Sequence, residues 1–323
     1  MPSKAATFEI AGRPIGPDHP PYIIAEISAN HQGNLEKALI LLEAAAATGA
    51  DAIKIQTYTA NTITIPHSSE EFRIKGGLWD GYLLYDLYKE AETPYEWHTA
   101  LFAKARELGI TLFSTPFDET AVDLLASLDA PAYKIASFEV IDLPLIAYVA
   151  KRRKPMIIST GMANLGEIQE AVETARANGA DAVALLHCTS AYPAPIEEAN
   201  VRTVAHLGEA FGVVSGLSDH APGSAACVAA TVLGGSIIEK HFTISRADGG
   251  PDAAFSLEPH EFRKLVDDCK SAWSALGVVG YSLTDSERGS TLFRRSIYAV
   301  KPIKAGQTLT ADNVRSIRPG FGL

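Results

Sequence analysis

Cysteine, tryptophan and methionine are all scarce in this sequence, with three of each among 323 residues. The cysteines Cys188, Cys227 and Cys269 are odd in number and far apart, which argues against a disulfide framework and for a reducing compartment. Basic residues are also few, since 28 Lys and Arg stand against 38 Asp and Glu and leave a formal net charge of −10. No cluster of Lys and Arg rises above this background, so we expect no nucleic-acid partner.

Long apolar runs and targeting signals are missing as well. The longest weakly polar run spans residues 224–238 and is broken by Gly234 and Gly235, whereas a membrane-spanning helix needs about 20 apolar residues. The first 16 residues contain no apolar core of a secretory signal. We therefore expect a cytoplasmic protein with no membrane partner.

Three common cofactor and metal motifs are absent from the sequence. No G-x-G-x-x-G follows the first predicted strand, and neither a phosphate-binding P-loop nor H-E-x-x-H occurs. These absences argue against a Rossmann dinucleotide site, a nucleoside triphosphate site and a zincin-type zinc site. What remains is the composition of an ordinary folded chain, with 47% hydrophobic and 20% charged residues.

Short apolar segments alternate with helical patterns over most of the chain. We expect eight strands, at residues 22–27, 51–56, 111–115, 132–136, 156–160, 182–188, 213–220 and 236–241. Continuous apolar runs without polar alternation are typical of parallel strands that are buried on both faces. Eight strand–helix units predict an α/β protein with a (β/α)8 TIM barrel, and a doubly wound sheet is the alternative.

Both ends of the chain differ from this repeat. Residues 8–16 read FEIAGRPIG and predict a hairpin, which we expect at the floor of the barrel. After Gly280 the sequence has β-branched runs and glycine turns but no long helical pattern, which indicates a small β-rich module. We therefore divide the chain into a barrel over 1–280, a linker over 281–290 and the module over 291–323.

Polar side chains gather at the predicted carboxyl ends of the strands. In TIM barrels this end carries the active site. One polar strand end is ordinary, but a plain core would not place ionisable groups at the same end of strand after strand. The residues are Glu26, Ser28, Asn30, His31, Lys54, Gln56, Ser114, Thr115, Lys134, Ser137, Ser159, Thr160, His187, Thr189, Ser190, Ser218, Asp219, His220, Glu239, Lys240 and His241.

His220 and His241 form the sharpest pair among these residues. They are 21 residues apart (241 − 220), which is one strand–helix unit, and neighbouring strand ends lie about 5 Å apart. Two imidazoles at that distance predict a shared Mn, Fe, Co or Zn ion, and no cysteine stands in phase to favour structural zinc. The alternative is a pair of hydrogen-bonded histidines that binds no metal.

Lys54 and Lys134 lie inside apolar strands, where an unpaired ammonium group would be costly. They could pair with carboxylates, bind an anionic substrate or form a Schiff base. Hydroxyl side chains at neighbouring strand ends favour a cradle for phosphate and carboxylate groups. These hydroxyls belong to Thr115, Ser137, Ser159, Ser190 and Ser218. Cys188 is interpreted as a small buried hydrophobic residue and not as a nucleophile.

An aromatic and acidic segment, residues 76–97, follows the second predicted strand. Its aromatic side chains either cap the barrel or form a wall of the substrate pocket. Aromatic faces suit sugars and the methyl groups of their acetamido substituents. The segment is therefore a candidate for recognition of an amino sugar.

Eight motifs, in this order, resemble the sialic acid synthase family: IAEISANH, GADAIKIQTYT, STPFD, YKIASFE, STGMA, CTSAYPA, GLSDH and IEKHF. The resemblance runs from about Phe8 to the end of the chain. Within the family, the motifs ANHQGN, QTYTANTIT, LYDLYKEAETPYEWH, KIASFE, GGPDAAFSLEP and RRSIYAVKPI look more like the pseudaminic acid branch than the N-acetylneuraminate branch. The tail resembles the start of the family's antifreeze-like (SAF) domain and ends at RPGFGL, so we expect that domain to be incomplete.

This resemblance implies a condensation of phosphoenolpyruvate with an amino sugar in its open-chain aldehyde form. For the pseudaminic branch the sugar is 2,4-diacetamido-2,4,6-trideoxy-L-altrose, and the products are pseudaminic acid and phosphate, released by C–O cleavage. N-acetylneuraminate or legionaminate synthesis is the alternative within the family. A Schiff-base aldolase and a non-catalytic sugar-acid binding protein are the alternatives outside it.

The resemblance also implies roles for individual residues. His220 and His241 match the ligands of a divalent metal, expected to be Mn²⁺, with Mg²⁺ and Co²⁺ as alternatives, and Glu26 matches a carboxylate near the reacting centre. The phosphoenolpyruvate site matches Lys54, Thr115, Lys134, Ser137, Ser159, Ser190 and Ser218. The sugar site matches Gln56, Tyr192, Asp252 and Arg318. Ser190 stands where neuraminate synthases have Asn, and the arginine at 318 is expected to come from the partner in a domain-swapped homodimer.

Overall fold

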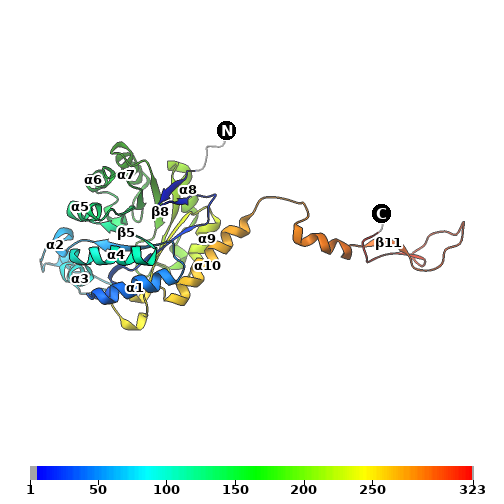
Figure 1. Ribbon diagram of the computed structural model, residues 1–323, viewed down its shortest axis with the longest axis horizontal. Coiled ribbons are helices and arrows are strands. Elements are labelled where there is room, and N and C mark those ends of the chain that lie inside the picture. Colours follow the sequence, from blue (N-terminus) through cyan, green and yellow to red (C-terminus); the bar gives the residue numbers. More distant parts are fainter. Residues whose placement is uncertain (1–5, 322–323) are drawn as a thin grey trace. The chain divides into compact units, whose positions relative to one another are not determined.

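Eight parallel strands close into a barrel in the computed structural model, which describes residues 6–321 (Figure 1). The strands follow one another around the barrel in chain order, and β10 pairs with β3 to close it. They are β3 (Tyr22–Glu26), β4 (Ala52–Thr57), β5 (Thr111–Pro116), β6 (Tyr133–Ile135), β7 (Met156–Ser159), β8 (Val183–Cys188), β9 (Val214–Asp219) and β10 (Ile237–His241). The predicted (β/α)8 barrel is confirmed, and the doubly wound sheet is excluded because the sheet is closed.

Helices surround the barrel, one after each strand (Figure 1). They are α1 (Leu35–Ala47), α4 (His98–Leu108), α5 (Glu119–Ser127), α6 (Leu143–Ala150), α7 (Leu165–Ala177), α8 (Arg202–Phe211), α9 (Ala225–Val232) and α10 (Pro259–Leu276). Two further helices, α2 (Ala60–Ile63) and α3 (Leu84–Ala91), belong to the long excursion that follows β4. Among the helices in residues 6–321, none is both long and apolar enough to cross a membrane.

Local sequence signals set several helix ends. The Asn34 side chain accepts a hydrogen bond from Lys37 N (3.0 Å) at the start of α1, which satisfies a backbone donor that the helix leaves free. Helices α4 and α8 end at Gly109 and Gly212, whose φ angles of 68° and 61° are left-handed. Glycine adopts that conformation without steric cost, so these two positions stop the helices.

The hairpin of β1 (Phe8–Ile10) and β2 (Arg13–Ile15) closes the amino-terminal end of the barrel. Its residues Ile10 and Ile15 are fully buried in the same apolar cluster as the first residues of the strands, Tyr22 and Ile237. Arg13 also pairs with Asp51 just before β4, at 3.0 Å. The predicted floor hairpin is therefore confirmed, and the chemistry is left to the opposite end of the barrel.

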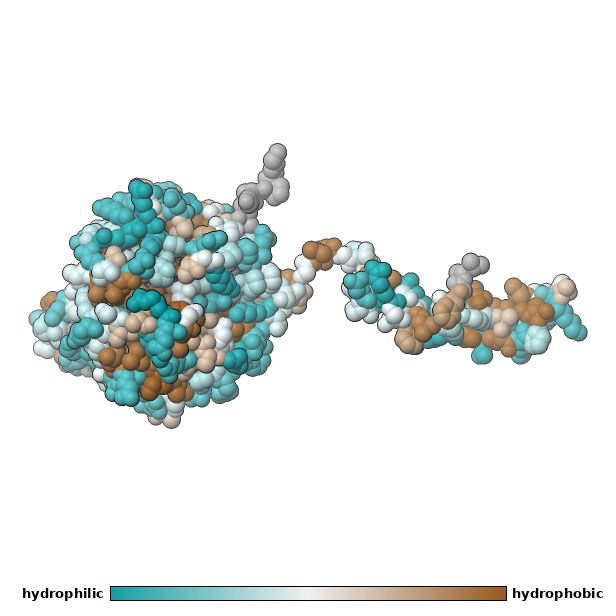
Figure 2. Space-filling model, in the orientation of Figure 1, coloured by the Kyte–Doolittle hydropathy of each residue, from teal (hydrophilic) through white to brown (hydrophobic). Residues whose placement is uncertain are grey.

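Residues 277–323 form a second compact unit, and residues 1–276 form the first. The second unit contains a 3-10 helix over Asp285–Phe293 and a two-stranded antiparallel sheet of β11 (Ser296–Ala299) and β12 (Val314–Ile317). Figure 2 shows hydrophobic residues on the surface of this unit taken by itself. Its exposed large apolar side chains include Leu292, Phe293, Ile297 and Leu309. A module this small buries little of its own apolar surface.

Candidate active site

A cavity at the carboxyl ends of the strands brings most of the predicted site residues together. Its lining comprises Glu26, Lys54, Gln56, Thr115, Lys134, Ala136, Ser137, Ser159, Cys188, Tyr192, Ser218, His220, Glu239 and His241. Every strand of the barrel contributes at least one residue, at its end or just beyond it. Among the described residues 6–321, the lining includes all residues predicted for the metal, phosphoenolpyruvate and sugar sites except Ser190, Asp252 and Arg318.

Strand alternation explains which residues face the cavity. Successive side chains of a strand point to opposite faces, so Glu239 and His241 of β10 enter the barrel while Lys240 between them points outward. The same alternation brings Ser218 and His220 inward on either side of Asp219. Neighbouring parallel strands are in register, and these inward residues therefore meet across the cavity.

Two lysines and two glutamates form a buried charge cluster in the cavity. The Lys54 ammonium contacts Glu26, lies 3.6 Å from Glu239 Oε1 and donates to Thr115 Oγ1 at 3.0 Å. Lys134 Nζ lies 3.7 Å from the same Glu239 oxygen and donates to Ser159 Oγ at 2.7 Å. Both lysines therefore pair with carboxylates. This was one of the three alternatives that the sequence left open for them. Glu239 links them, and the sequence assigned it no role.

Burial and pairing with lysine shift the pKa values of the two carboxyl groups of this cluster in opposite directions. Burial raises the pKa of Glu26 to about 7, although Lys54 opposes the shift. Burial also opposes ionisation of Glu239, but Lys134 and Lys54 outweigh it and lower the pKa of that carboxyl. Since two carboxyls with separated pKa values are suited to different roles, Glu26 is the group that can exchange a proton near neutral pH.

The other predicted hydroxyl side chains contact groups at neighbouring strand ends. Ser137 Oγ accepts a hydrogen bond from Gly161 N (3.1 Å), and Ser218 Oγ donates to Glu239 Oε1 (3.3 Å). A Cβ atom at Gly161 would lie 2.2 Å from Ser190 Oγ and 2.8 Å from Ser137 Oγ. Only glycine at this position lets the two serines approach, so Ser190 lies beside the cavity lining although it is not part of it.

The two histidines lie side by side, with ring centroids 5.3 Å apart. His220 Nδ1 lies 3.0 Å from the Thr189 carbonyl, whereas His241 Nδ1 is buried and has no hydrogen-bond partner among residues 6–321. A satisfied histidine pair would not leave that atom free. Cys188 Sγ lies 3.8 Å from His220 Nδ1, so the expectation that no cysteine is in phase with the pair is wrong.

The histidine pair fits a divalent metal ion on the chemistry of its donors. Burial, with His220 adding to it, lowers the pKa of His241 well below its ordinary value, so this imidazole is neutral at pH 7. For His220, burial also lowers the pKa, but Cys188 and the Thr189 carbonyl outweigh it and raise the pKa above its ordinary value. Neutral imidazole is the form that binds metals. The described part of the chain brings no three His, Cys, Asp or Glu side chains together as ligands. Two imidazoles from the chain suit an open site that water and substrate complete.

Aromatic side chains extend from the histidines toward the rim of the cavity. The Tyr192 ring lies 4.4 Å from His220 and 5.6 Å from Trp79, measured between centroids, and the Phe255 ring lies 4.9 Å from His241. Trp79 belongs to the segment 76–97, and its Nε1 donates to the Pro251 carbonyl at 3.1 Å. The segment therefore reaches the site through Trp79. This agrees with the interpretation that the segment forms a wall of the substrate pocket.

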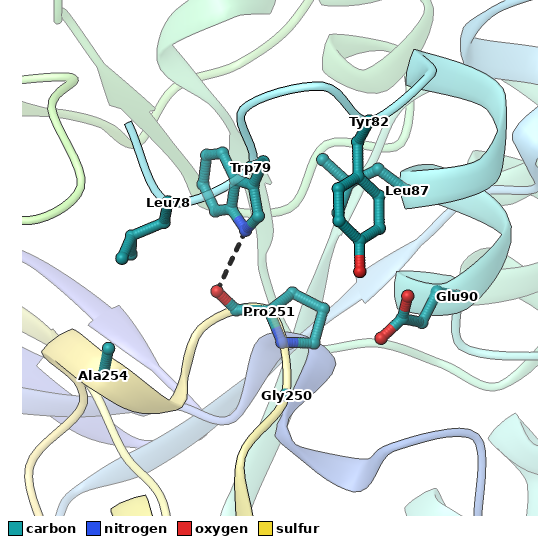
Figure 3. Close-up of a pocket in the computed structure, with 8 residues that line it drawn as sticks. All are labelled: Leu78, Trp79, Tyr82, Leu87, Glu90, Gly250, Pro251 and Ala254. Carbon is teal, nitrogen blue, oxygen red and sulfur yellow. Dashed lines mark hydrogen bonds between the residues drawn. The ribbon is translucent and has the colours of Figure 1, made fainter. Parts of the chain in front are cut away.

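A second pocket is lined by Trp79 as well (Figure 3). Trp79 and Tyr82 point from the excursion toward Pro251 on the loop after β10, and Glu90 of α3 closes one side. The remaining lining residues are Leu78, Leu87, Gly250 and Ala254. The sequence did not distinguish Trp79 from its aromatic neighbours, because only the fold brings the excursion and the loop after β10 together.

Asp252 and Arg318 are the two remaining residues of the predicted sugar site. Asp252 is buried, its Oδ2 accepts a weak hydrogen bond from Ala29 N at 3.5 Å, and burial raises its pKa. Arg318 lies in the second unit, where its guanidinium carbon is 5.9 Å from the Phe293 ring centroid. The roles of both residues in sugar binding stay predictions.

Comparison with known proteins assigns the chain to a family. Residues 41–281 match the NeuB family, and residues 294–323 match the SAF domain. The chain belongs to the NeuB family. A pseudaminic acid synthase from Campylobacter jejuni is 46% identical over 302 residues, which cover 94% of this chain and 88% of that protein. A pseudaminic acid synthase from Helicobacter pylori is 44% identical over 308 residues, covering 94% and 90%.

A solved structure of a related protein has the same architecture as this NeuB chain. The crystal structure of the N-acetylneuraminic acid synthetase from Leptospira borgpetersenii in complex with citrate superposes with a TM-score of 0.79 at 30% identity. The match covers 88% of this chain and 95% of that one. The predicted membership of the sialic acid synthase family is confirmed, and so is the SAF module at the end of this NeuB chain.

Proposed function

We propose that this chain is a pseudaminic acid synthase, which condenses phosphoenolpyruvate with open-chain 2,4-diacetamido-2,4,6-trideoxy-L-altrose. The observation that carries the proposal is the 46% identity to a pseudaminic acid synthase over nearly the whole chain. The buried cluster of lysines, glutamates and hydroxyls beside two histidines supports it, because these groups suit an anionic substrate and a proton transfer.

The lysines and hydroxyls would bind phosphoenolpyruvate. Lys54 and Lys134 supply buried ammonium groups, which form strong charge-assisted hydrogen bonds with phosphate and carboxylate oxygens. Thr115 and Ser159 already contact these ammonium groups and hold them in place. Substrate oxygens would take over part of the pairing that Glu239 provides, so we propose that Glu239 keeps the lysines charged and oriented before the substrate arrives.

The proposed reaction forms one carbon–carbon bond and breaks one carbon–oxygen bond. C3 of phosphoenolpyruvate attacks the aldehyde carbon, which leaves positive charge at C2. Water adds to C2, and the tetrahedral intermediate expels phosphate together with the bridging oxygen. Glu26 accepts one proton of that water, since its pKa of about 7 lets the carboxylate act as a base near neutral pH. This proton balances the one that the aldehyde oxygen takes up as it becomes a hydroxyl group, and the second water proton leaves with the phosphate when C2 becomes a ketone.

His220 and His241 would hold the divalent ion, proposed to be Mn²⁺, with Mg²⁺ and Co²⁺ as alternatives. Such an ion, when bound, supplies Lewis-acid polarisation of an aldehyde oxygen. Gln56 and Tyr192 from the cavity lining, and Asp252 beyond it, are proposed to face the sugar. A cytoplasmic, domain-swapped homodimer, in which the partner contributes the arginine at position 318, completes the proposal.

The substrate choice is tested by the rate of phosphate release with three sugars and Mn²⁺. We expect release with the diacetamido-altrose and not with its bacillosamine-derived mannose counterpart or with N-acetylmannosamine. Release with a mannose-configured sugar would instead assign the chain to the legionaminate or neuraminate branch. Borohydride trapping with pyruvate tests the Schiff-base alternative, and a labelled Lys54 or Lys134 would contradict the proposed mechanism.

Replacing Trp79 with alanine should raise the KM for the sugar about tenfold and leave the KM for phosphoenolpyruvate unchanged. The variant loses a ring contact with Tyr192 and a hydrogen bond to Pro251, together worth about 1.4 kcal/mol. Initial rates of phosphate release at varied sugar concentration measure the effect. Trp273→Ala is a matched control, because the Trp273 indole also donates to a proline carbonyl at 3.1 Å, but on helix α10. Equal effects of both variants on sugar KM would contradict the prediction.

A further inference from the structure

A buried ion pair lies directly behind the two histidines, on the outer side of the barrel wall. Lys240 Nζ is 2.6 Å from Asp219 Oδ2, and the two side chains are 0% and 4% exposed. Cys227 of helix α9 donates its thiol hydrogen to the same carboxylate oxygen, at 3.2 Å. Cys227 and its neighbours belong to the apolar layer between the barrel and the helices. The charges are therefore surrounded by apolar side chains and far less solvated than at the surface.

Stability alone is a weak reason for such a pair. Removing two charges from water costs several kcal/mol per ion, and well-packed apolar residues of similar volume often stabilise a protein as well or better. The position of the pair therefore matters more than its contribution to the free energy of unfolding. Asp219 and Lys240 are direct partners in the parallel register of β9 and β10. His220 and His241 are the next residues on these two strands.

Lys240 also binds the residues on both sides of His220. Its ammonium group contacts Asp219, which precedes His220, and donates to the carbonyl of Ala221, which follows it. The second Asp219 oxygen accepts a hydrogen bond from Ala221 N at 2.9 Å. One lysine on the strand of His241 thus fixes the short backbone segment that carries His220.

We infer that Asp219 and Lys240 are positioning residues, which hold the His220 imidazole at the distance from His241 that a shared metal ion requires. The inference rests on the metal site in the proposed function. Neither side chain belongs to the cavity lining found within residues 6–321, so the pair acts only through the backbone of the two histidines. The ion pair joins β9 and β10 next to the two histidines. It therefore keeps their rings 5.3 Å apart even when no ion is bound.

The test is a titration of the metal-free protein with Mn²⁺, in which electron paramagnetic resonance measures the free ion. The double variant Asp219→Asn/Lys240→Met removes both charges, keeps the side-chain volumes close to the original and keeps an acceptor for Ala221 N. We expect its Kd for Mn²⁺ to rise roughly 10- to 100-fold, as for other residues that orient metal ligands. Its Tm and its affinity for phosphoenolpyruvate without metal should stay close to those of the wild type.

A matched control removes an ion pair at the other end of the barrel. Arg13→Met/Asp51→Asn abolishes the 3.0 Å pair below the strands, and its Kd for Mn²⁺ should equal that of the wild type. A wild-type Kd in the Asp219/Lys240 variant would overturn the inference. If the double variant does not fold, the nearly isosteric Asp219→Asn decides the question, since a raised Kd supports the inference and an unchanged Kd overturns it.

The outcome is separable from that of the proposed function. Full phosphate release by wild-type protein that has been stripped of metal would overturn the inference and leave the synthase activity standing. Weakened Mn²⁺ binding by the variant supports the inference even if none of the tested sugars is a substrate. Both results come from the full chain, and neither depends on the activity of the variant.

Discussion

Replacing His241 with alanine is expected to lower kcat/KM for the condensation about 10³-fold or more while leaving the barrel folded. His241 Nδ1 makes no hydrogen bond within residues 6–321, and its ring contacts Phe255 and His220. Truncation therefore breaks no polar contact of that atom but removes one of the two proposed metal ligands, whose electrostatic contribution to the transition state is several kcal/mol. Phosphate release and a Mn²⁺ titration measure the two consequences.

His187→Ala provides the matched control for this variant. His187 also lies near the end of a barrel strand, β8, but its Nε2 is 2.9 Å from the Ala199 carbonyl, and it does not belong to the cavity lining defined by the described residues. We expect this variant to lose about 1 kcal/mol of stability with its hydrogen bond and to retain its kcat. If His241→Ala kept normal metal-dependent turnover, the assignment of the metal site would be wrong.

Replacing Glu26 with glutamine should lower kcat by about 10²- to 10⁴-fold, the usual range for loss of a general acid or base. Glu26 Oε1 accepts a hydrogen bond from Ser28 N at 2.7 Å, which an amide oxygen can also accept, so the backbone here should keep its conformation. The variant loses the proton-exchanging group and the charge that faces Lys54. Thermal unfolding and the KM for phosphoenolpyruvate separate a folding defect from a catalytic one.

The same residue predicts the pH dependence of the reaction. Burial raises the pKa of Glu26 to about 7, so the carboxylate that acts as base is the minor form below that pH. The kcat/KM of the wild type should therefore fall as the pH drops below about 7, and the glutamine variant should lose this limb. Burial also raises the pKa of Glu139 to about 7. A limb that persists in Glu26→Gln and disappears in Glu139→Gln would show that the wrong carboxyl was assigned.

The barrel could be predicted because its strands are buried on both faces. Runs such as residues 22–26 contain no polar alternation until their last residue, and their spacing along the chain left little choice beyond eight parallel units. The strand-end residues were predictable for the same reason, since the carboxyl ends of parallel strands meet at one end of the barrel. Lys54, Lys134, His220 and His241 meet there.

Pairings between strands could not be read from the sequence. The bridging position of Glu239 depends on which side chains the closed barrel brings within 4 Å of each other, and no local pattern encodes that. The sequence predicts no cysteine in phase with the histidines, yet the thiol of Cys188 lies beside His220 because β8 and β9 are direct neighbours. Trp79 reaches Tyr192 only because the excursion after β4 folds back over the loop after β10.

The fate of the bridging oxygen of phosphoenolpyruvate distinguishes C–O cleavage from P–O cleavage. The substrate is labelled with oxygen-18 between C2 and phosphorus and incubated with the enzyme, Mn²⁺ and the diacetamido-altrose. We expect all of the label to appear in inorganic phosphate, seen as an isotope shift in its phosphorus NMR signal, and we expect release to require the sugar. Label retained in the organic product would mean P–O cleavage and would contradict the proposed addition of water at C2.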